Sequence, residues 1–250
     1  MFALADTKCS VLPCRNRLPS IGLSLAEAVH PAGYDRLQSQ VIPGYGSLAR
    51  LAVALLSSSP QAQIEGSSVL VAGCGTGAEL LEAVAQRPDW RLTALDPSDE
   101  MLQASRDRLG EGASIRWHQD TVEGFVAADA EAGGYAGALS VLVLQSLPDD
   151  GSKLAYLSAL AQCLQPGAQL VLVDLMRSSL TSLEPQLDAA WDRFQRASGL
   201  DLTRDQLPSE GLHPIGLARL TSLVNAAGFG DPARVFQALG FEGFLLQKRG

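Results

Sequence analysis

Three glycines at alternate positions follow a short apolar run in the first third of the chain. The run is Val69–Ala72, and Gly73, Gly75 and Gly77 come directly after it. A short apolar run that ends at glycine predicts a buried strand, and the Ala-, Leu- and Glu-rich segment 78–86 predicts a helix. The glycines therefore form a strand-to-helix turn, where a ligand can approach the backbone without meeting a Cβ. The helix would present free N–H groups and its positive dipole end to that ligand.

Two aspartates follow the next two predicted strands, 91–95 and 115–118. In an open parallel sheet, ligands bind outside the carboxyl ends of the strands. Asp96 lies about twenty residues beyond the glycines, a spacing at which a carboxylate can accept hydrogen bonds from both hydroxyls of a ribose. Asp120 can accept a hydrogen bond from an adenine amino group. The plain alternatives are a helix-capping acid at Asp96 and a turn acid at Asp120.

Strands and helices alternate from Ser68 onward, which favours a parallel sheet covered on both faces. Beyond the segments already named, the patterns predict strands at 136–144 and 169–174, helices at 99–109 and 149–164, and a closing hairpin of 234–239 with 241–247. Ser98 or Asp99 can cap the helix at 99–109. We therefore expect a Rossmann-like, doubly wound α/β fold with a mostly parallel seven-stranded sheet and an antiparallel last strand.

Two segments outside this alternation predict covering layers. Residues 1–60 predict an N-terminal arm and helical cap, before the main domain at 61–250. Residues 176–214 are too many for a simple connection and predict a helical lid insertion. Apolar side chains recur there at helical spacing, at Leu183, Leu187, Trp191 and Phe194. We expect this stripe to pack the lid, and stacking on a substrate is the alternative.

The composition excludes several classes of protein. The chain has 250 residues, a net charge of −8 and 46% hydrophobic residues, so it provides no basic field for nucleic acid. No apolar run reaches the roughly 18–20 residues that span a bilayer. Cys9 and Cys14 have neither a second cysteine pair nor nearby histidines, so we expect no metal site. The start lacks an apolar signal segment, and we expect a cytoplasmic monomer or homodimer.

The glycine turn also fits a relaxed dinucleotide fingerprint through Gly73, Gly75 and Ala78. A nicotinamide cofactor is therefore an alternative ligand. That hypothesis leaves Asp120 and the segment 164–167 without a role. It also expects a second half of parallel strands, where this chain ends in a predicted hairpin.

Five stretches taken in order carry a family resemblance. They are 69–77, Asp96-Pro97-Ser98 with Met101-Leu102, Asp120, 144–148 and 164–167. Together they resemble the successive motifs of class I S-adenosylmethionine-dependent methyltransferases, and the similarity covers roughly residues 30 to 250. The resemblance implies that S-adenosylmethionine is the cofactor. It implies the following binding residues: Tyr45, Gly73, Cys74, Gly75, Gly77, Asp96, Pro97, Met101, Asp120, Thr121 and Ser140.

The resemblance also implies a part for each group of these residues. The glycines would pass the backbone close to the methionine part of the cofactor, which Tyr45 would also contact. Asp96 would bind the ribose, and Asp120 with the Thr121 N–H would bind the adenine edge. Ser140, near the end of the fourth strand, would border the sulfonium. Pro97 and Met101 would line the adenine, and Cys74 matches a position where small residues are usual.

Within the family, segments 42–45 and 241–245 look most like the branch that contains carboxy-S-adenosylmethionine synthase and its small-molecule-methylating relatives. By that resemblance, the synthase needs a cation for the added carboxylate of its cofactor. Arg219 is near the matching helix, but Leu223 and Val224 occupy the turn before Gly228. The sequence therefore favours a methyltransferase over the synthase.

We expect methyl transfer to a small, fairly apolar molecule. The sulfonium is already activated, so positioning and exclusion of water supply most of the acceleration. A general base is needed only if the acceptor must lose a proton, and His213 in the insertion is the candidate base, with a solvated loop histidine as the alternative. The sequence also allows a non-methylating enzyme that uses the same cofactor, such as the synthase or a cyclase, and a non-catalytic scaffold. An RNA methyltransferase conflicts with the acidic balance.

Overall fold

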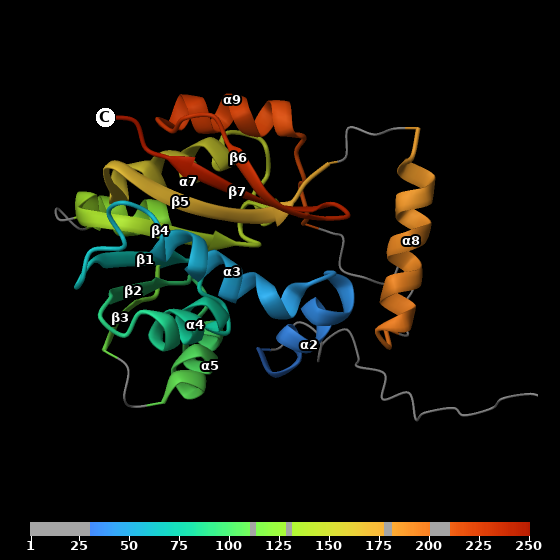
Figure 1. Cartoon of the computed structure of the whole chain (residues 1–250), viewed down its shortest axis with the longest axis horizontal. Coiled ribbons are helices and arrows are strands. Elements are labelled where there is room, and N and C mark those ends of the chain that lie inside the picture. Colours follow the sequence, from blue (N-terminus) through green and yellow to red (C-terminus); the bar gives the residue numbers. More distant parts are fainter. Residues whose placement is uncertain (1–30, 111–113, 129–131, 178–181, 201–210) are drawn as a thin grey trace, which may run out of the picture.

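The computed structural model describes residues 31–110, 114–128, 132–177, 182–200 and 211–250. The predicted N-terminal arm and parts of the predicted lid lie outside these described residues. One sheet forms the body, and helix α8 (Glu184–Ala197) lies at its side next to helix α2 (Pro31–Val41), as Figure 1 shows.

Within the described residues, seven strands form one sheet in the order β3-β2-β1-β4-β5-β7-β6. The strands are β1 (Ser68–Ala72), β2 (Arg91–Leu95), β3 (Ile115–His118), β4 (Tyr135–Val141), β5 (Leu164–Leu175), β6 (Ala233–Ala238) and β7 (Phe241–Gln247). Strands β1 to β5 pair in parallel, whereas β7 runs antiparallel to β5 and β6. The strand order switches direction between β1 and β4, which is where such sheets bind ligands. The predicted fold class is confirmed.

Helices cover both faces of the sheet because alternate strand residues point to opposite sides. One face carries α3 (Tyr45–Ser57), α4 (Ala78–Gln86) and α5 (Asp99–Leu109), and the other carries α6 (Val122–Ala128), α7 (Ser152–Cys163) and α9 (Leu217–Ala227). In β1, Val69 and Val71 pack with the first set, and Leu70 and Ala72 with the second. Both clusters are buried, as expected for a sheet with a helical layer on each side.

Helix α3 packs directly on the sheet and on α4. Its fully buried Leu56 lies over Gly137 in the middle of β4. A Cβ at Gly137 would lie 2.6 Å from Leu56 Cδ1 and 3.1 Å from its Cγ. The missing side chain at Gly137 therefore sets how closely α3 approaches the sheet.

Helix α8 is anchored to the N-terminal helix and to the closing hairpin. The Trp191 indole N–H donates a hydrogen bond of 2.7 Å to the Val41 carbonyl, and its ring meets Phe241 edge-on at a centroid distance of 5.7 Å. Gln40 Nε2 donates a hydrogen bond of 3.2 Å to the Ser198 carbonyl. Trp191 therefore packs α8 against the body, as its helical stripe predicted.

Two strands differ from their predicted bounds by more than one residue at one end, and one helix was not predicted. The strand expected over 136–144 ends at Val141, because Leu142 adopts a left-handed conformation with φ of 60° and a 3-10 turn covers Leu144–Ser146. Strand β5 begins earlier than predicted, because Leu164 pairs with Tyr135. Helix α6 was not predicted, since only Val122 and Phe125 are buried along it.

No helix in the described part of the chain is long and apolar enough to cross a membrane.

The contact between α3 and β4 gives a stability prediction. Gly137→Ala should lower the free energy of unfolding by about 1–3 kcal/mol, because the added methyl overpacks the fully buried Leu56. Gly134→Ala is the matched control, since a Cβ there meets no atom within 4 Å. Urea unfolding of both variants measures the difference. Equal stability of the two variants would contradict the described packing of α3.

Candidate active site

The glycine turn after β1 uses its three glycines for three different reasons. All three have positive φ, at 68°, 50° and 83° for Gly73, Gly75 and Gly77. A Cβ at Gly73 would lie 2.4 Å from Val143 Cγ2, and one at Gly77 would lie 2.2 Å from Ser105 Oγ. A Cβ at Gly75 would meet no atom within 4 Å. Gly73 and Gly77 are thus needed for packing, whereas Gly75 borders open space where a ligand can approach the backbone.

Helix α4 begins at this turn without a side-chain cap. Gly77 is its N-cap residue and supplies no side chain to accept from the first turn. The first N–H groups of a helix have no partner within the helix and carry a partial positive charge. The N–H groups of Gly73, Cys74, Gly75 and Gly77 already donate hydrogen bonds within the protein. The start of α4 is therefore the part that can present backbone donors to a ligand.

Asp96 joins the glycine turn to the end of β2. Its Oδ2 accepts a hydrogen bond of 2.8 Å from the Gly75 N–H, and its Oδ1 accepts one of 2.9 Å from the Ser98 N–H. The side chain is 7% exposed, so both oxygens are held in one orientation. Each carboxylate oxygen has a further lone pair, and the site can therefore accept hydrogen bonds from a diol such as a ribose.

The segment after Asp96 starts helix α5. Ser98 is the N-cap, and its Oγ accepts a hydrogen bond of 3.3 Å from the Met101 N–H, which confirms the predicted cap. Pro97 is exposed and Met101 is half-buried. Pro97 follows Asp96 directly and Met101 lies in the first turn of α5, and the predicted part of both residues in lining adenine stays a prediction.

Asp120 follows β3 and is bonded within its own turn. Its Oδ1 accepts a hydrogen bond of 2.7 Å from the Thr121 N–H. This N–H is the group that was predicted to bind the adenine edge together with Asp120. Gly124, in the first turn of α6, has no room for a Cβ, because Asp120 Oδ1 would lie 2.1 Å from it. The turn thus fixes Asp120 at the carboxyl end of the sheet, on the same edge as Asp96.

The residues at the end of β4 form one side of the region around the glycine turn. Ser140 Oγ shares a 2.7 Å hydrogen bond with the Tyr156 hydroxyl of α7, so the Ser140 hydroxyl is buried between the sheet and α7. Leu142 then turns the chain with its left-handed φ, and its N–H donates 2.7 Å to the Val173 carbonyl. That turn brings Val143 onto Gly73, and the lining here is apolar.

A buried carboxylate that the sequence did not reveal holds this segment in place. Asp174, at the end of β5, accepts hydrogen bonds from the N–H groups of Leu144 and Gln145 at 2.8 and 2.9 Å. Lys153 of α7 is also buried and donates to the Leu144 carbonyl. Burial raises the pKa of Asp174 to about 7, and burial lowers that of Lys153. Asp174 and Lys153 together hold the chain segment that follows β4.

Asp35 is a second residue that sequence reasoning missed. Its Oδ1 accepts hydrogen bonds from the Tyr45 hydroxyl at 2.9 Å and the Thr76 hydroxyl at 2.8 Å, and its Oδ2 pairs with Arg108 at 2.7 Å. Arg108 also donates to the Thr76 carbonyl at 3.2 Å. Asp35 therefore ties the N-terminal helices to the glycine turn and places Tyr45 there. Burial, followed by the Asp35 charge, raises the pKa of Tyr45, so its hydroxyl stays protonated.

Acidic groups surround the glycine turn. Glu79, in the first turn of α4, is 9% exposed, and no other side chain of the described residues hydrogen-bonds it. Burial raises its pKa to about 7, and the Asp35 charge adds to this. Burial raises the pKa of Tyr34, and the nearby charges of Glu79, Asp35 and Asp96 raise it further. Arg108 balances the charge of Asp35, so Asp96 and ionised Glu79 supply the negative potential that suits a cationic ligand.

Cys74 has no nucleophilic character in this site. It is 2% exposed within the glycine turn, and burial raises the pKa of its thiol to about 12. A thiol with such a pKa stays protonated at neutral pH and is unreactive. Cys74 therefore acts as a small packed side chain.

His213 lies apart from the glycine turn, beyond the ends of β4 and β5. Its backbone N–H donates a hydrogen bond of 2.6 Å to the Gln145 carbonyl. Its exposed side chain lines a cavity of about 280 Å³ with Asp149, Arg177 and Arg219. The role of His213 as a base stays a prediction.

S-adenosylmethionine fits these residues on three observations. Gly75 borders open space, the α4 N-terminus is uncapped, and Asp96 is a buried, fixed acceptor. The carboxylate of Glu79, when ionised, would match its positive charge, whereas Arg108 balances that of Asp35. Among the described residues, no group of three or more His, Cys, Asp or Glu side chains is arranged to hold a metal ion.

Comparison with known proteins identifies the family. Residues 46–231 match a family model described as a methyltransferase domain, and the chain belongs to that family. It is a class I S-adenosylmethionine-dependent methyltransferase, and S-adenosylmethionine is its cofactor. None of the curated protein sequences matches the chain significantly.

Solved structures share the fold at low sequence identity. The methyltransferase SibL in its apo form aligns with a TM-score of 0.58 and 18% identity over 83% of this chain and 57% of SibL. The Burkholderia thailandensis 1,6-didemethyltoxoflavin-N1-methyltransferase aligns with a TM-score of 0.55 and 19% identity over 82% of this chain and 80% of that enzyme. Human N-acetylserotonin methyltransferase aligns with a TM-score of 0.57 and 14% identity over 91% and 57%. The chain thus spans about half the length of SibL and of the human enzyme.

The raised pKa of Glu79 gives a prediction with opposite signs for stability and binding. The folded protein holds this proton more tightly than the unfolded chain, so Glu79 lowers stability as the pH rises from about 4.5 to about 7. Glu79→Gln should therefore raise the free energy of unfolding at pH 8 by roughly 1–3 kcal/mol, and change it little at pH 4. The same variant should bind S-adenosylmethionine more weakly at pH 8, since a negative charge near the cationic cofactor is lost.

Glu82→Gln is the control for this prediction, because Glu82 lies on the same helix and pairs with Arg50 at the surface. Urea unfolding and titration calorimetry at both pH values measure the two effects. A Glu79→Gln variant with unchanged stability and unchanged affinity would contradict the electrostatic role of Glu79.

Proposed function

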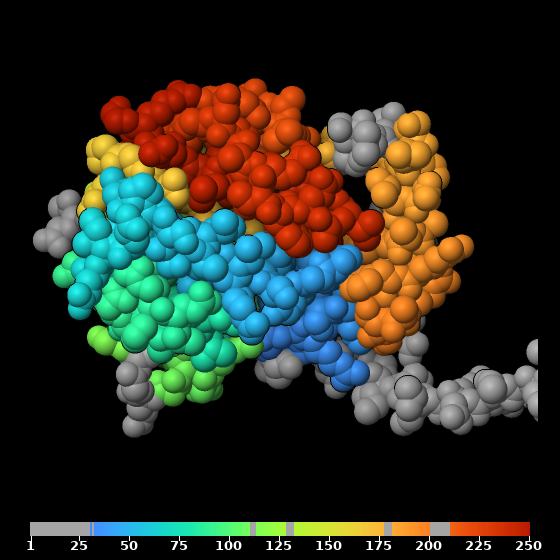
Figure 2. All heavy atoms as spheres, viewed as in Figure 1, coloured from blue at the N-terminus to red at the C-terminus, as the bar shows by residue number. Residues whose placement is uncertain are grey.

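We propose that this enzyme transfers the methyl group of S-adenosylmethionine to a small, fairly apolar molecule bound between α8 and the β6–β7 hairpin. The observation that carries the proposal is a cavity of about 390 Å³ at that place. Small-molecule sites have volumes of roughly 300–1,000 Å³. Figure 2 shows an opening between α8 and the hairpin. The cavity therefore has the size of a metabolite site.

The cavity lies one strand away from the switch point of the sheet. Leu175, at the end of β5, lines it, and the Leu175 N–H donates a hydrogen bond of 3.1 Å to Gln145 Oε1 in the segment after β4. Its apolar lining comes from the sheet, the lid and the hairpin: Leu175, Met176, Leu187, Trp191, Pro214 and Leu239. An acceptor bound there would lie beside the apolar residues at the end of β4 that border the cofactor site.

Two of the similar structures support a small acceptor. One is named for 1,6-didemethyltoxoflavin, which is bound in it together with S-adenosylhomocysteine, and another is named for N-acetylserotonin. These names describe those proteins. They support, for this chain, a small molecule rather than a macromolecule as acceptor.

The residues act chiefly by holding the reactants. When bound, S-adenosylmethionine would supply a methyl group on a sulfonium, and the sulfur compound left behind needs no proton from the enzyme. Asp96 and the glycine turn would fix the nucleoside, and Asp35 would keep Tyr45 against the methionine end. The apolar side chains of Leu142 and Val143 would exclude water at the end of β4, and orientation of the acceptor would provide most of the rate.

His213 remains the proposed general base. It lines the cavity next to the acceptor cavity, and the two cavities share Arg177 and Pro214. A base is required only for an acceptor that must lose a proton. We also propose a cytoplasmic monomer or homodimer that does not bind nucleic acid, in keeping with the net charge of −8.

The carboxy-S-adenosylmethionine synthase alternative loses its cation. Arg219 is the candidate partner for the extra carboxylate, but its guanidinium makes a bidentate ion pair with Asp149, at 2.9 and 3.0 Å. A neutralised guanidinium at the surface is a poor site for a further anion. This pairing favours methyl transfer.

The proposal is tested with S-adenosylmethionine that carries a radiolabelled methyl group. Wild-type protein and a cell extract are incubated with it, and the products are separated into small-molecule, nucleic-acid and protein fractions. We expect the label to enter the small-molecule fraction as S-adenosylhomocysteine accumulates. Label in the nucleic-acid or protein fraction would contradict the proposed acceptor class, and formation of a carboxylated cofactor would contradict methyl transfer.

A further inference from the structure

The two cavities beside the lid meet at one arginine. Arg177 follows the last residues of β5 and lines both the acceptor cavity and the smaller cavity near α9. Its backbone is fixed, since the Arg177 N–H donates a hydrogen bond of 2.9 Å to the Ile215 carbonyl. Its guanidinium is exposed and makes no ion pair or hydrogen bond within the described part of the chain.

The smaller cavity has an excess of positive charge. Arg219 and Asp149 neutralise each other there. Among the lining residues, this leaves the Arg177 guanidinium without a counter-charge, and the His213 imidazole lines the same cavity. Gly216 and Ile215 also line the cavity at the start of α9, which has neither a side-chain cap nor an acidic residue in its first turn. These groups favour an anion over a cation.

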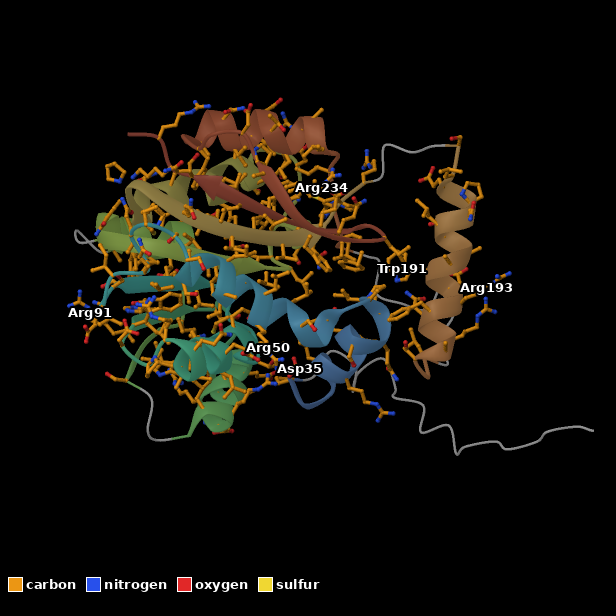
Figure 3. All side chains as sticks on the ribbon, in the orientation of Figure 1. Asp35, Arg50, Arg91, Trp191, Arg193 and Arg234 are labelled. Carbon is orange, nitrogen blue, oxygen red and sulfur yellow. The ribbon has the colours of Figure 1, made fainter. Side chains whose placement is uncertain are left out.

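The larger cavity has the opposite balance on its lid side. Arg234 pairs with the buried Glu242 at 2.7 Å and so contributes no net charge. Glu184 of α8 lines the wall of this cavity on the α8 side. Its carboxylate would repel an anionic group from that wall, and the same group would be drawn toward Arg177. Figure 3 shows Trp191 on the side of α8 that faces the hairpin.

We propose that the methyl acceptor carries an anionic group, a carboxylate or a phosphate, which binds Arg177, while its apolar part lies in the cavity between α8 and the hairpin. This inference rests on the proposed function and narrows its acceptor to an amphipathic anion. A guanidinium presents a planar fork of donors that matches both carboxylate and phosphate oxygens. Arg177 is thus a specificity-determining residue rather than part of the methyl-transfer chemistry.

The test uses three aromatic probes of similar size: benzoate, phenyl phosphate and the neutral benzamide. Each is titrated at low ionic strength into the protein saturated with S-adenosylhomocysteine, because salt screens an exposed charge. The NMR signals of the Arg177 side-chain N–H and the Trp191 indole N–H report binding. We expect at least one anion to bind about tenfold more tightly than benzamide, as a charge-assisted hydrogen bond at an exposed site allows.

Two variants make the test specific. Arg177→Gln should remove the preference for the anions, and Arg193→Gln should keep it, since Arg193 projects from the outer side of α8 in Figure 3. The ratio of the two anion affinities tells whether a carboxylate or a phosphate is preferred. Equal binding of benzamide and both anions, no binding of any probe, or an anion preference that survives in Arg177→Gln would overturn the proposal.

Titration of S-adenosylhomocysteine alone separates this inference from the function on which it rests. Normal cofactor binding without an anion preference would overturn only the role of Arg177. Absence of cofactor binding by the wild-type protein would instead remove the proposed function.

Discussion

The site depends on one carboxylate that links two strands. Asp96 holds the Gly75 N–H with one oxygen and the Ser98 N–H with the other, so the turn after β1 and the start of α5 share a fixed geometry. The fit of Gly73 against Val143 and of Gly77 against Ser105 confines the turn on both sides. Between these two packed glycines, Gly75 borders open space. A ligand meets backbone donors and a buried acceptor that are already in place, which lowers the entropic cost of ordering the site.

A second layer of constraints acts at the ends of β4 and β5. Asp174 and Lys153, both buried, hold the segment that follows the left-handed Leu142. Asp35 does the same for Tyr45 and the glycine turn from the N-terminal side. Each of these three charged groups is held by hydrogen bonds, as the two buried ones, Asp174 and Lys153, must be. These hydrogen bonds hold the residues around the glycine turn and after β4 in place, and we propose that α8, the hairpin and Arg177 select the substrate.

Local patterns predicted the fold well because strands, glycines and helix caps act over short distances. The closing hairpin, the mostly parallel sheet and the Ser98 cap each follow from residues that are close to one another in the sequence. The end of β4 was predicted three residues too late, because Asp174, thirty residues away from Leu144 in sequence, turns the chain there. Asp35 was missed for the same reason: its partners Thr76 and Arg108 lie on other elements. Long-range polar contacts carry no local sequence signal.

The central claim is that Asp96 and the glycine turn hold the cofactor, and titration calorimetry with S-adenosylhomocysteine tests it most directly. Asp96→Asn keeps the shape of the side chain but loses its charge and one acceptor, and Asp99→Asn changes an exposed acid in the first turn of α5. Thermal denaturation first checks that both variants are folded. Asp96→Asn should then bind S-adenosylhomocysteine at least about tenfold more weakly than wild type, because a charged hydrogen bond is lost. Asp99→Asn should bind it as tightly as wild type. Unchanged affinity in folded Asp96→Asn would contradict the account.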